Sequence, residues 1–267
     1  MKLFGSTTFA ILTIVLSVLS LFATCSTHAA ALSPVKVPSH LAMGPGEYAN
    51  SIIVNGETRD YILHIPSGYD SKPVPLVIVL HPHGSSAKGI EKTSDMSTKA
   101  DKEGFLVVYP NGTGNPRAWN AGFYPLNPTQ SDDVAFISAV IDKLEKDLQV
   151  DVNRIYVCGF SNGGFMTYRL GAELSERLAA IAVVEGTIGA RQPDGSILRI
   201  PNPSRPIPLI AFNGKEDRAV PYNGGRGIDG IDFLSTADSI IFWVKQDGCN
   251  TTPKTTVIQN GNIVETD

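Results

Sequence analysis

Apolar residues along this chain gather in short continuous runs that are separated by more polar segments. The runs at 74–80, 105–109 and 155–157 are apolar at consecutive positions, which predicts strands buried on both faces of a sheet. Further strands are expected at 178–184, 209–212 and 255–259. Helical patterns lie between these runs. Such an alternation of strand and helix is typical of a mostly parallel central sheet covered by helices on both faces.

The best-defined helix is predicted from Ser131 to Leu148, because its apolar positions recur every three or four residues and form one buried stripe. Ser131 is expected to cap the free amide groups at its start. We interpret Asp132 and Asp133 as residues that favour the positive helix end rather than as catalytic residues. Other helices are expected at 91–103, after residue 161, and at 233–245.

A hairpin is predicted at the beginning of the folded region. The strands 51–54 and 59–65 flank Asn55-Gly56, a pair that favours a tight turn between antiparallel strands. The segment before it, 32–46, is rich in Pro and Gly and is interpreted as a linker. We therefore expect one folded domain at 47–267.

Residues 1–31 have a different composition from the rest of the chain. Lys2 is followed by an apolar run and then by Ala29-Ala30-Ala31, with no acidic residue, which is typical of a secretory signal peptide. The alternatives are an uncleaved anchor helix and lipidation at Cys25. A signal peptide predicts a secreted protein, extracellular or periplasmic, with no membrane segment after cleavage.

Composition and charge narrow the function. The 267 residues are 42% hydrophobic and 18% charged, which fits one globular domain, and the net charge is −4 without a basic cluster. Nucleic-acid binding is therefore not expected. The five histidines form no H-E-x-x-H motif and no C-x-x-C occurs, so we expect no metal and no cofactor. Nothing in the sequence indicates an oligomeric state.

A candidate nucleophile lies in Gly159-Phe160-Ser161-Asn162-Gly163, which joins a predicted strand to a predicted helix. A serine on such a sharp turn has strained backbone angles that are tolerated when glycines flank it, and its hydroxyl is left exposed. This arrangement is a nucleophile elbow, and it makes Ser161 the candidate catalytic serine.

A nucleophilic serine needs an acid and two amide donors for the oxyanion. One donor is the amide after the nucleophile, on Asn162. The other is expected in the turn after the strand 74–80, and it falls on His83 because Pro82 has no N–H group. The acid is expected to follow a later strand, and we choose Asp217 over its neighbour Glu216.

Several motifs together resemble a known family. They are Phe105–Thr113, Trp119–Gly122, Asp132–Val134, Gly159–Gly164 and Val220–Tyr222, in this order. The chain from about Glu47 to Asp267 resembles the secreted esterases grouped as polyhydroxybutyrate depolymerases and feruloyl or acetylxylan esterases. The resemblance implies an α/β-hydrolase fold, Ser161 as nucleophile, Asp217 as acid, and hydrolysis of small-molecule or polymeric esters without a cofactor.

The sequence departs from the family at two places. Pro82-His83 replaces residues that are commonly glycines, and no histidine follows Asp217. The family's histidine lies in a later Gly-rich loop, and the resemblance places a partner for Cys249 in the same segment. We therefore expect an incomplete chain that lacks the last strand or strands and has an unpaired apolar sheet edge. The alternative is a domain that evolved without the base.

Some assignments stay open at this stage. His81 or His83 could replace the missing base, although the same loop must also present an amide. Trp119, Phe123, Tyr124 and Tyr222 could line a site for an aromatic acyl group, but packing is the favoured interpretation. The Gly-rich segment 223–230 is either a rim of the substrate pocket or a surface loop. The rival function is a non-catalytic protein on the same fold that binds esters or polysaccharides; a peptidase fits less well because no additional domain is available.

Overall fold

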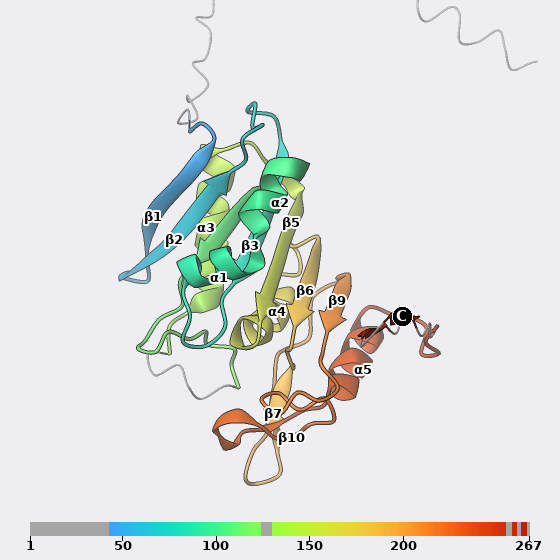
Figure 1. Ribbon diagram of the computed structural model, residues 1–267. Helices are drawn as coiled ribbons and strands as arrows, with labels where there is room; N and C mark the ends of the chain where they lie inside the picture. The colour runs from blue at the N-terminus through green and yellow to red at the C-terminus, as the bar shows by residue number, and fades with distance from the viewer. Residues whose placement is uncertain (1–42, 124–129, 255–257, 261–262, 266–267) are drawn as a thin grey trace, which may run out of the picture. The chain divides into compact units, whose positions relative to one another are not determined.

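A seven-stranded sheet forms the centre of the protein (Figure 1). The computed structural model describes residues 43–123, 130–254, 258–260 and 263–265, all within the unit His40–Asp267. The expected signal peptide, residues 32–42 of the expected linker, and Tyr124 lie outside these residues. The strands of the central sheet are β1 (Gly46–Val54), β2 (Glu57–Ile65), β3 (Val74–Leu80), β4 (Leu106–Pro110), β5 (Val150–Phe160), β6 (Ala180–Val184) and β9 (Leu209–Phe212).

The strand order is β1-β2-β4-β3-β5-β6-β9. β2 pairs antiparallel with both β1 and β4, and the remaining neighbours are parallel. The predicted first hairpin is present, with β1 and β2 joined at Asn55 and Gly56. Both turn residues have positive φ angles, 51° and 82°, as a tight two-residue turn requires. The sheet is thus mostly parallel, as predicted.

Helices cover both faces of this sheet. They are α1 (Ala87–Ser94), α2 (Met96–Glu103), α3 (Asp133–Asp147), α4 (Asn162–Glu173) and α5 (Thr236–Gln246). Figure 1 shows α1 and α2 in front of the sheet and α3 and α4 behind it. Successive side chains of β3 point to opposite faces of the sheet, so both faces are buried. Leu76, Ile78 and Leu80 belong to the core that includes α3 and α4, whereas Val79 belongs to the core that includes α1.

The start of α3 corrects one prediction. Asp132, and not Ser131, caps the helix: its carboxylate accepts a hydrogen bond from Ala135 N at 3.0 Å, which places the cap one residue later than expected. The Ser131 hydroxyl instead donates to Glu57 Oε1 at 3.3 Å. Asp133 is fully buried and forms an ion pair with Arg59 at 2.6 Å, so it has a structural role that the sequence did not indicate.

A second, smaller sheet was not predicted. Its order is β10-β11-β7-β8, and its strands are β7 (Gly189–Arg191), β8 (Ile197–Arg199), β10 (Gly225–Arg226) and β11 (Asp232–Phe233). The Gly-rich segment 223–230 therefore contains the strand β10 of this sheet, followed by the short 3-10 helix Ile228–Gly230. Phe233 is also in a strand, and α5 begins three residues later than predicted because Ser235 and Asp238 form a capping box.

The two last described strands form a separate pair, β12 (Ile258–Asn260) with β13 (Ile263–Glu265). Part of the strand predicted at 255–259 thus exists, and its first three residues lie outside the described ones. Among the described strands, β9 is the last of the central sheet.

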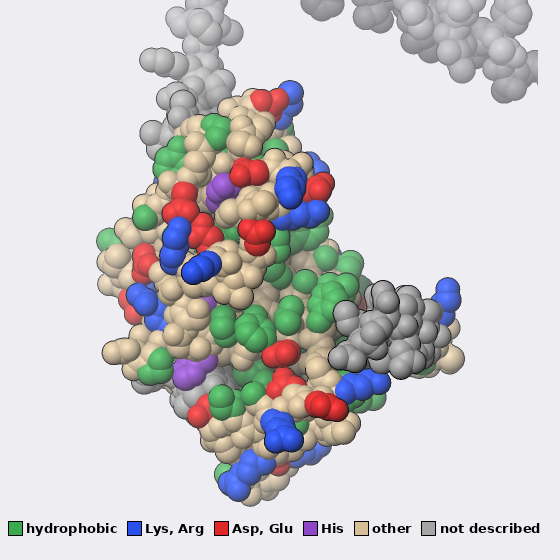
Figure 2. Space-filling view, viewed as in Figure 1, with side chains coloured by type: hydrophobic (Ala, Val, Ile, Leu, Met, Phe, Trp, Pro, Cys, Tyr) green, Lys and Arg blue, Asp and Glu red, His purple; other side chains and the backbone are tan. Residues whose placement is uncertain are grey.

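One region of the central sheet is apolar and open to solvent. Cys158, Ala182 and Ile210 are aligned across β5, β6 and β9, on the face that α1 and α2 cover further along the sheet. Ile210 and Phe212 are each 54% exposed, so the described residues do not cover this part of the sheet. Figure 2 shows hydrophobic side chains gathered over β6 and β9. We call Val184, Ile210 and Phe212 the open face.

Candidate active site

Ser161 lies on a sharp turn between β5 and α4. Its backbone angles are φ 55° and ψ −120°, a conformation that costs a non-glycine residue about 1–3 kcal/mol. Two hydrogen bonds hold it there: its N–H donates to Val184 O at 2.9 Å, and its carbonyl accepts from Phe165 N at 2.9 Å. The predicted strand, turn and helix are therefore present, and the serine is half-buried at the end of the strand.

The glycines beside Ser161 are required by close backbone approaches. A Cβ atom on Gly159 would lie 2.2 Å from the Gly163 carbonyl oxygen, and one on Gly163 would lie 2.4 Å from the Leu80 oxygen. Real Cβ atoms do not approach backbone oxygens so closely. The two glycines thus let the turn close and bring the start of α4 against the end of β3.

Asn162, the residue after the serine, fixes a neighbouring segment. Its side chain is 1% exposed; Oδ1 accepts from Trp119 N at 2.7 Å, and Nδ2 donates to Trp119 O at 3.1 Å. The Trp119 indole N–H in turn donates to His81 O at 2.9 Å. The elbow, the 119–123 segment and the turn after β3 are therefore one hydrogen-bonded unit, which holds the two candidate oxyanion segments, at His83 and Asn162, together.

His81 is excluded as a replacement base. It is fully buried, and its Nε2 must be an acceptor because Gly112 N–H donates to it at 2.9 Å. Its Nδ1 then carries the proton and donates to Pro82 O at 2.8 Å. Burial lowers the pKa of His81 to about 4, so the ring is neutral. Both nitrogens are occupied in holding the turn. His83 lies half-buried in the same turn.

Asp217 follows β9, at the same carboxyl edge of the sheet as Ser161. Its Oδ1 accepts from the amides of Ala219 at 2.7 Å and Val220 at 3.0 Å, which fixes the carboxylate. In the described part of the chain, its Oδ2 is buried without a hydrogen-bond partner. Glu216 is exposed. The side chain that retains an unused buried oxygen is the one expected of an orienting acid.

A residue that the sequence did not indicate lies beside these two. Glu185 immediately follows β6 and has a positive φ angle of 50°. Burial raises its pKa, and the negative charge of Asp217 raises it further. The signal was an acidic residue directly after an apolar parallel strand, where ligands and reactive groups gather in α/β proteins.

The aromatic residues considered for an acyl site differ in their surroundings. Trp119 is fully buried, and Phe123 packs against Phe165 with ring centroids 5.5 Å apart. Phe165 packs in the same way against Phe233 of β11. Trp119 therefore does not line a substrate surface, whereas Phe123 retains contact with a cavity.

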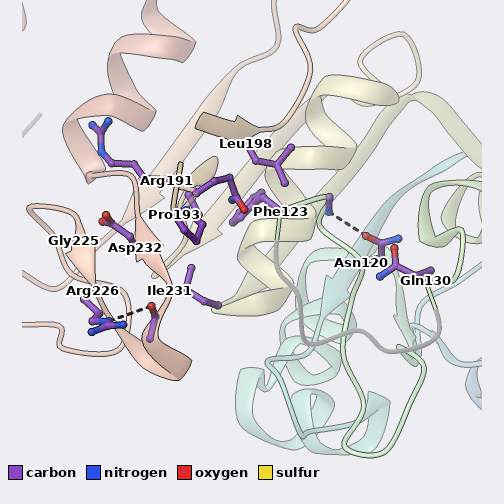
Figure 3. A pocket seen from close by; sticks show the side chains of 14 residues that line it. Asn120, Phe123, Gln130, Arg191, Pro193, Leu198, Gly225, Arg226, Ile231 and Asp232 are labelled. Carbon is purple, nitrogen blue, oxygen red and sulfur yellow. Dashed lines mark hydrogen bonds between the residues drawn. The ribbon is translucent and has the colours of Figure 1, made fainter. Parts of the chain in front are cut away.

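That cavity has a volume of about 680 Å³, within the range of small-molecule sites, and lies between the 120–123 segment and the second sheet (Figure 3). Figure 3 shows Phe123, Pro193, Leu198 and Ile231 around its centre. Asn120 and Gln130 lie at the right of the view, across from Arg191, Asp232 and Arg226 at the left. Gly225, Arg226 and Gly230 also line it, so part of the 223–230 segment is a cavity wall. Phe123 packs against Phe165 of α4, the helix that begins at the elbow, but Ser161 and Asp217 are not among the residues that line the cavity.

Comparison with known proteins identifies the family. The sequence profile of the phospholipase/carboxylesterase family matches residues 67–229, which include β3, the elbow and Asp217. The chain belongs to this family. Relatives of this carboxylesterase chain include feruloyl esterase B of Piromyces equi, 34% identical over 203 residues, covering 73% of the chain and 37% of the relative. Feruloyl esterase C of Emericella nidulans is 32% identical over 198 residues, covering 70% of the chain and 67% of the relative.

The chain spans only part of several relatives. It covers 50% of the putative esterase NocK of Nocardia uniformis subsp. tsuyamanensis, to which it is 35% identical over 66% of its own length. Solved structures with the same fold include a thermostable esterase, with a TM-score of 0.53 and 20% identity over 76% of the chain and 51% of that structure. Another is sOPH, with a TM-score of 0.55 and 18% identity; the match covers 78% of the chain and 77% of that structure. The α/β-hydrolase fold and the resemblance to feruloyl and acetylxylan esterases are thus confirmed.

Proposed function

We propose that this carboxylesterase-family chain is a secreted serine esterase that cleaves feruloyl or acetyl esters of polysaccharides through an acyl-enzyme. The observation that carries the proposal is the backbone strain at Ser161, which serves to expose a hydroxyl group at the carboxyl edge of the sheet. The relatives named as feruloyl esterases suggest the substrate class. Hydroxybutyrate esters, which the sequence resemblance also suggested, are a further candidate.

In the proposed mechanism, Ser161 Oγ attacks the ester carbonyl. The amides of Asn162 and His83 stabilise the oxyanion, and the hydrogen-bonded unit of Asn162, Trp119 and His81 holds them in place before reaction. A general base oriented by Asp217 Oδ2 takes the Ser161 proton as the Oγ–C bond forms. The proton passes to the leaving alcohol as its C–O bond breaks, and a water that gives its proton to the same base then hydrolyses the acyl-enzyme. The cavity beside Phe123 would hold the acyl or sugar part of the substrate. No cofactor is required.

The test combines labelling with a substrate panel. A fluorophosphonate probe should label the wild type and leave Ser161→Ala unlabelled, and intact-mass analysis should find one adduct. Methyl ferulate, acetylated xylan and a hydroxybutyrate oligomer distinguish the three ester classes. A folded wild-type protein that neither reacts with the probe nor hydrolyses any of these three substrates would overturn the proposal that this chain is an esterase.

The second candidate is a non-catalytic protein that binds esters or polysaccharides. It is favoured by the engagement of both His81 nitrogens in hydrogen bonds, which leaves neither of them free to act as a base. Binding of xylan fragments by a folded chain that the fluorophosphonate probe does not label would favour this candidate.

Secretion is proposed from residues 1–31 alone. In the part of the chain that the structure describes, no helix has both the length and the apolar character needed to cross a membrane. Sequencing the N-terminus of protein recovered from the culture medium tests the proposal, which predicts a new N-terminus directly after Ala29, Ala30 or Ala31.

A further inference from the structure

The turn that contains His83, one of the two candidate oxyanion residues, is tied to a neighbouring segment on both sides of that residue. On one side, the Trp119 indole N–H donates to His81 O at 2.9 Å. On the other side, Gly84 N–H donates to Arg117 O at 2.8 Å. The position of the His83 amide therefore depends on where this neighbouring segment lies.

Side chains hold all four backbone polar groups of Trp119 and Asn120. The amide side chain of Asn162, the other candidate oxyanion residue, bonds to both the N–H and the C=O of Trp119. Asn120 N–H donates to Asp133 Oδ2 at 2.7 Å, and Asn120 O accepts from Arg169 Nη1 at 2.7 Å. Asn162 and Arg169 belong to α4, and Asp133 belongs to α3. The segment that both oxyanion residues contact is thus anchored by side chains of two helices.

The anchor on α3 is a carboxylate that is buried together with a guanidinium group. The side chains of Asp133 and Arg59 are 0% and 3% exposed. Asp133 Oδ1 accepts from Arg59 Nη2 at 2.6 Å, while Oδ2 holds Asn120. Removing two charges from water is costly, so a buried ion pair adds little net stability. Charge-assisted hydrogen bonds do, however, fix the direction of both carboxylate oxygens.

These contacts close into a ring. Arg59 Nη2 donates to Asn111 O at 3.1 Å as well as to Asp133. The next residue, Gly112, donates its N–H to His81 Nε2 at 2.9 Å, in the turn after β3. The ring therefore leads from Asp133 through the anchored segment to this turn, and it returns through Arg59. Because the members are joined without a gap, a change at Asp133 alters the support of both oxyanion amides.

We propose that Asp133 is a positioning residue for the reaction. Its carboxylate, held by Arg59, fixes the amide of Asn120 and with it the segment that sets the places of the two oxyanion amides, on Asn162 and His83. The proposal rests on the proposed function, in which these two amides stabilise the oxyanion. Asp133 acts through this segment and not by contact with the ester. Such donors are effective because they are already in place before charge develops, so a small displacement costs rate rather than binding.

The variant that tests this role is Asp133→Asn, which changes the charge of the side chain but hardly its size. One of the two acceptor oxygens is replaced by a donor nitrogen, so either Arg59 or the Asn120 N–H faces another donor and the ring opens. The matched control is Asp247→Asn. Its carboxylate also accepts from a backbone amide, that of Ile207 at 2.9 Å, but it lies outside the ring.

The first test measures kcat and KM for 4-nitrophenyl acetate, with the reactive serines counted by fluorophosphonate titration. Removing a whole oxyanion donor lowers kcat by a factor of about 10² to 10³, and a displaced donor loses part of this effect. We expect Asp133→Asn to lower kcat per reactive serine about tenfold and to change KM less than twofold. Asp247→Asn should change neither by more than twofold. A kcat of Asp133→Asn within twofold of the wild-type value would overturn the proposal, even if the variant is less stable.

The second test observes the ring without any substrate. The chain has two tryptophans, Trp119 and Trp243, so ¹⁵N labelling of tryptophan gives two indole N–H signals, which Trp243→Phe assigns. In Asp133→Asn, hydrogen exchange of the Trp119 indole should be at least about tenfold faster, because its bond to His81 O belongs to the ring. Exchange of the Trp243 indole should be unchanged. Equal acceleration of both signals would show that Asp133 stabilises the whole fold only, which would contradict the proposal.

These results separate the two proposals. If the wild type hydrolyses esters and Asp133→Asn has the same kcat, the esterase stands and the positioning role of Asp133 is wrong. If the wild type neither hydrolyses an ester nor reacts with the probe, the proposed function fails, and the positioning role of Asp133 fails with it.

Discussion

Asn162 and Trp119 are joined by a reciprocal pair of hydrogen bonds, in which the amide side chain of one accepts from and donates to the backbone of the other at 2.7 and 3.1 Å. The pair is buried, and neither residue is adjacent to the other in sequence. It connects the elbow to the segment that forms one wall of the cavity. The side chain of Asn162 is thus structural, while its backbone amide is the candidate oxyanion donor.

Replacing Asn162 should therefore cost stability. In Asn162→Ala, the buried N–H and C=O of Trp119 lose their partners, and we expect the free energy of unfolding to fall by about 1–3 kcal/mol for each group left unsatisfied. Urea denaturation measures it. Asn153→Ala, at an exposed position in β5, is the matched control and should have little effect. A stability of Asn162→Ala equal to that of the control would show that the pair is not structural.

The strained backbone of Ser161 predicts that a glycine at this position gives a more stable protein than an alanine does. Ser161→Gly should raise the free energy of unfolding by about 1 kcal/mol relative to Ser161→Ala, because glycine adopts the observed φ of 55° without steric cost. Both variants lack the hydroxyl group, so the comparison isolates the backbone. Urea denaturation of the pair gives the difference, and a glycine variant less stable than the alanine variant would contradict the strained turn.

The lowered pKa of His81 predicts that the folded protein loses stability in acid. Its pKa is lowered to about 4 in the folded protein, whereas an unfolded chain has the usual value of 6.5. As the pH falls from 6.5 to 4, the unfolded state therefore gains a proton that the folded state does not, and the free energy of unfolding falls by about 3 kcal/mol. His81→Gln removes this titration. Denaturation curves at several pH values should give a steeper pH dependence for the wild type than for the variant, and parallel curves would disprove the assignment.

The exposed apolar side chains of the open face predict that copies of this chain associate with one another. Ile210 and Phe212 expose apolar side chains beside each other at the last strand of the described sheet. Replacing both with Thr, which also favours strands, should reduce dye binding by exposed apolar surface and reduce light scattering of concentrated protein. Ile53→Thr is the control, because Ile53 is 75% exposed but lies on β1. An equal improvement in the control would show that the open face has no special part in association.

The central sheet could be predicted from the sequence because its strands are long enough to carry a pattern. β3 and β9 lie where the apolar runs placed them. The second sheet could not be predicted in this way, since strands of two or three residues have no periodicity and form only through pairing with distant segments. Of the cavity that this sheet lines, the sequence indicated one wall only, the 223–230 segment considered as a pocket rim.

The candidate site was only partly predictable. The elbow has a local sequence signature, and the order of the elements placed Asp217 at the correct edge of the sheet. Glu185 has no such signature, because it comes near Asp217 only through the pairing of β6 with β9. The exclusion of His81 depended on hydrogen bonds to Gly112 and Pro82 that no local pattern specifies.

The second sheet is built entirely from chain that leaves the central sheet after β6 and after β9. Its pieces are joined to each other, as where Leu234 N–H donates to Gly189 O at 3.0 Å, and they carry much of the cavity wall. Among the described residues, the strands that present Ser161, Glu185 and Asp217 contribute nothing to that wall. The shape of the cavity can therefore change through these two segments of chain without displacing the strand ends that carry Ser161 and Asp217.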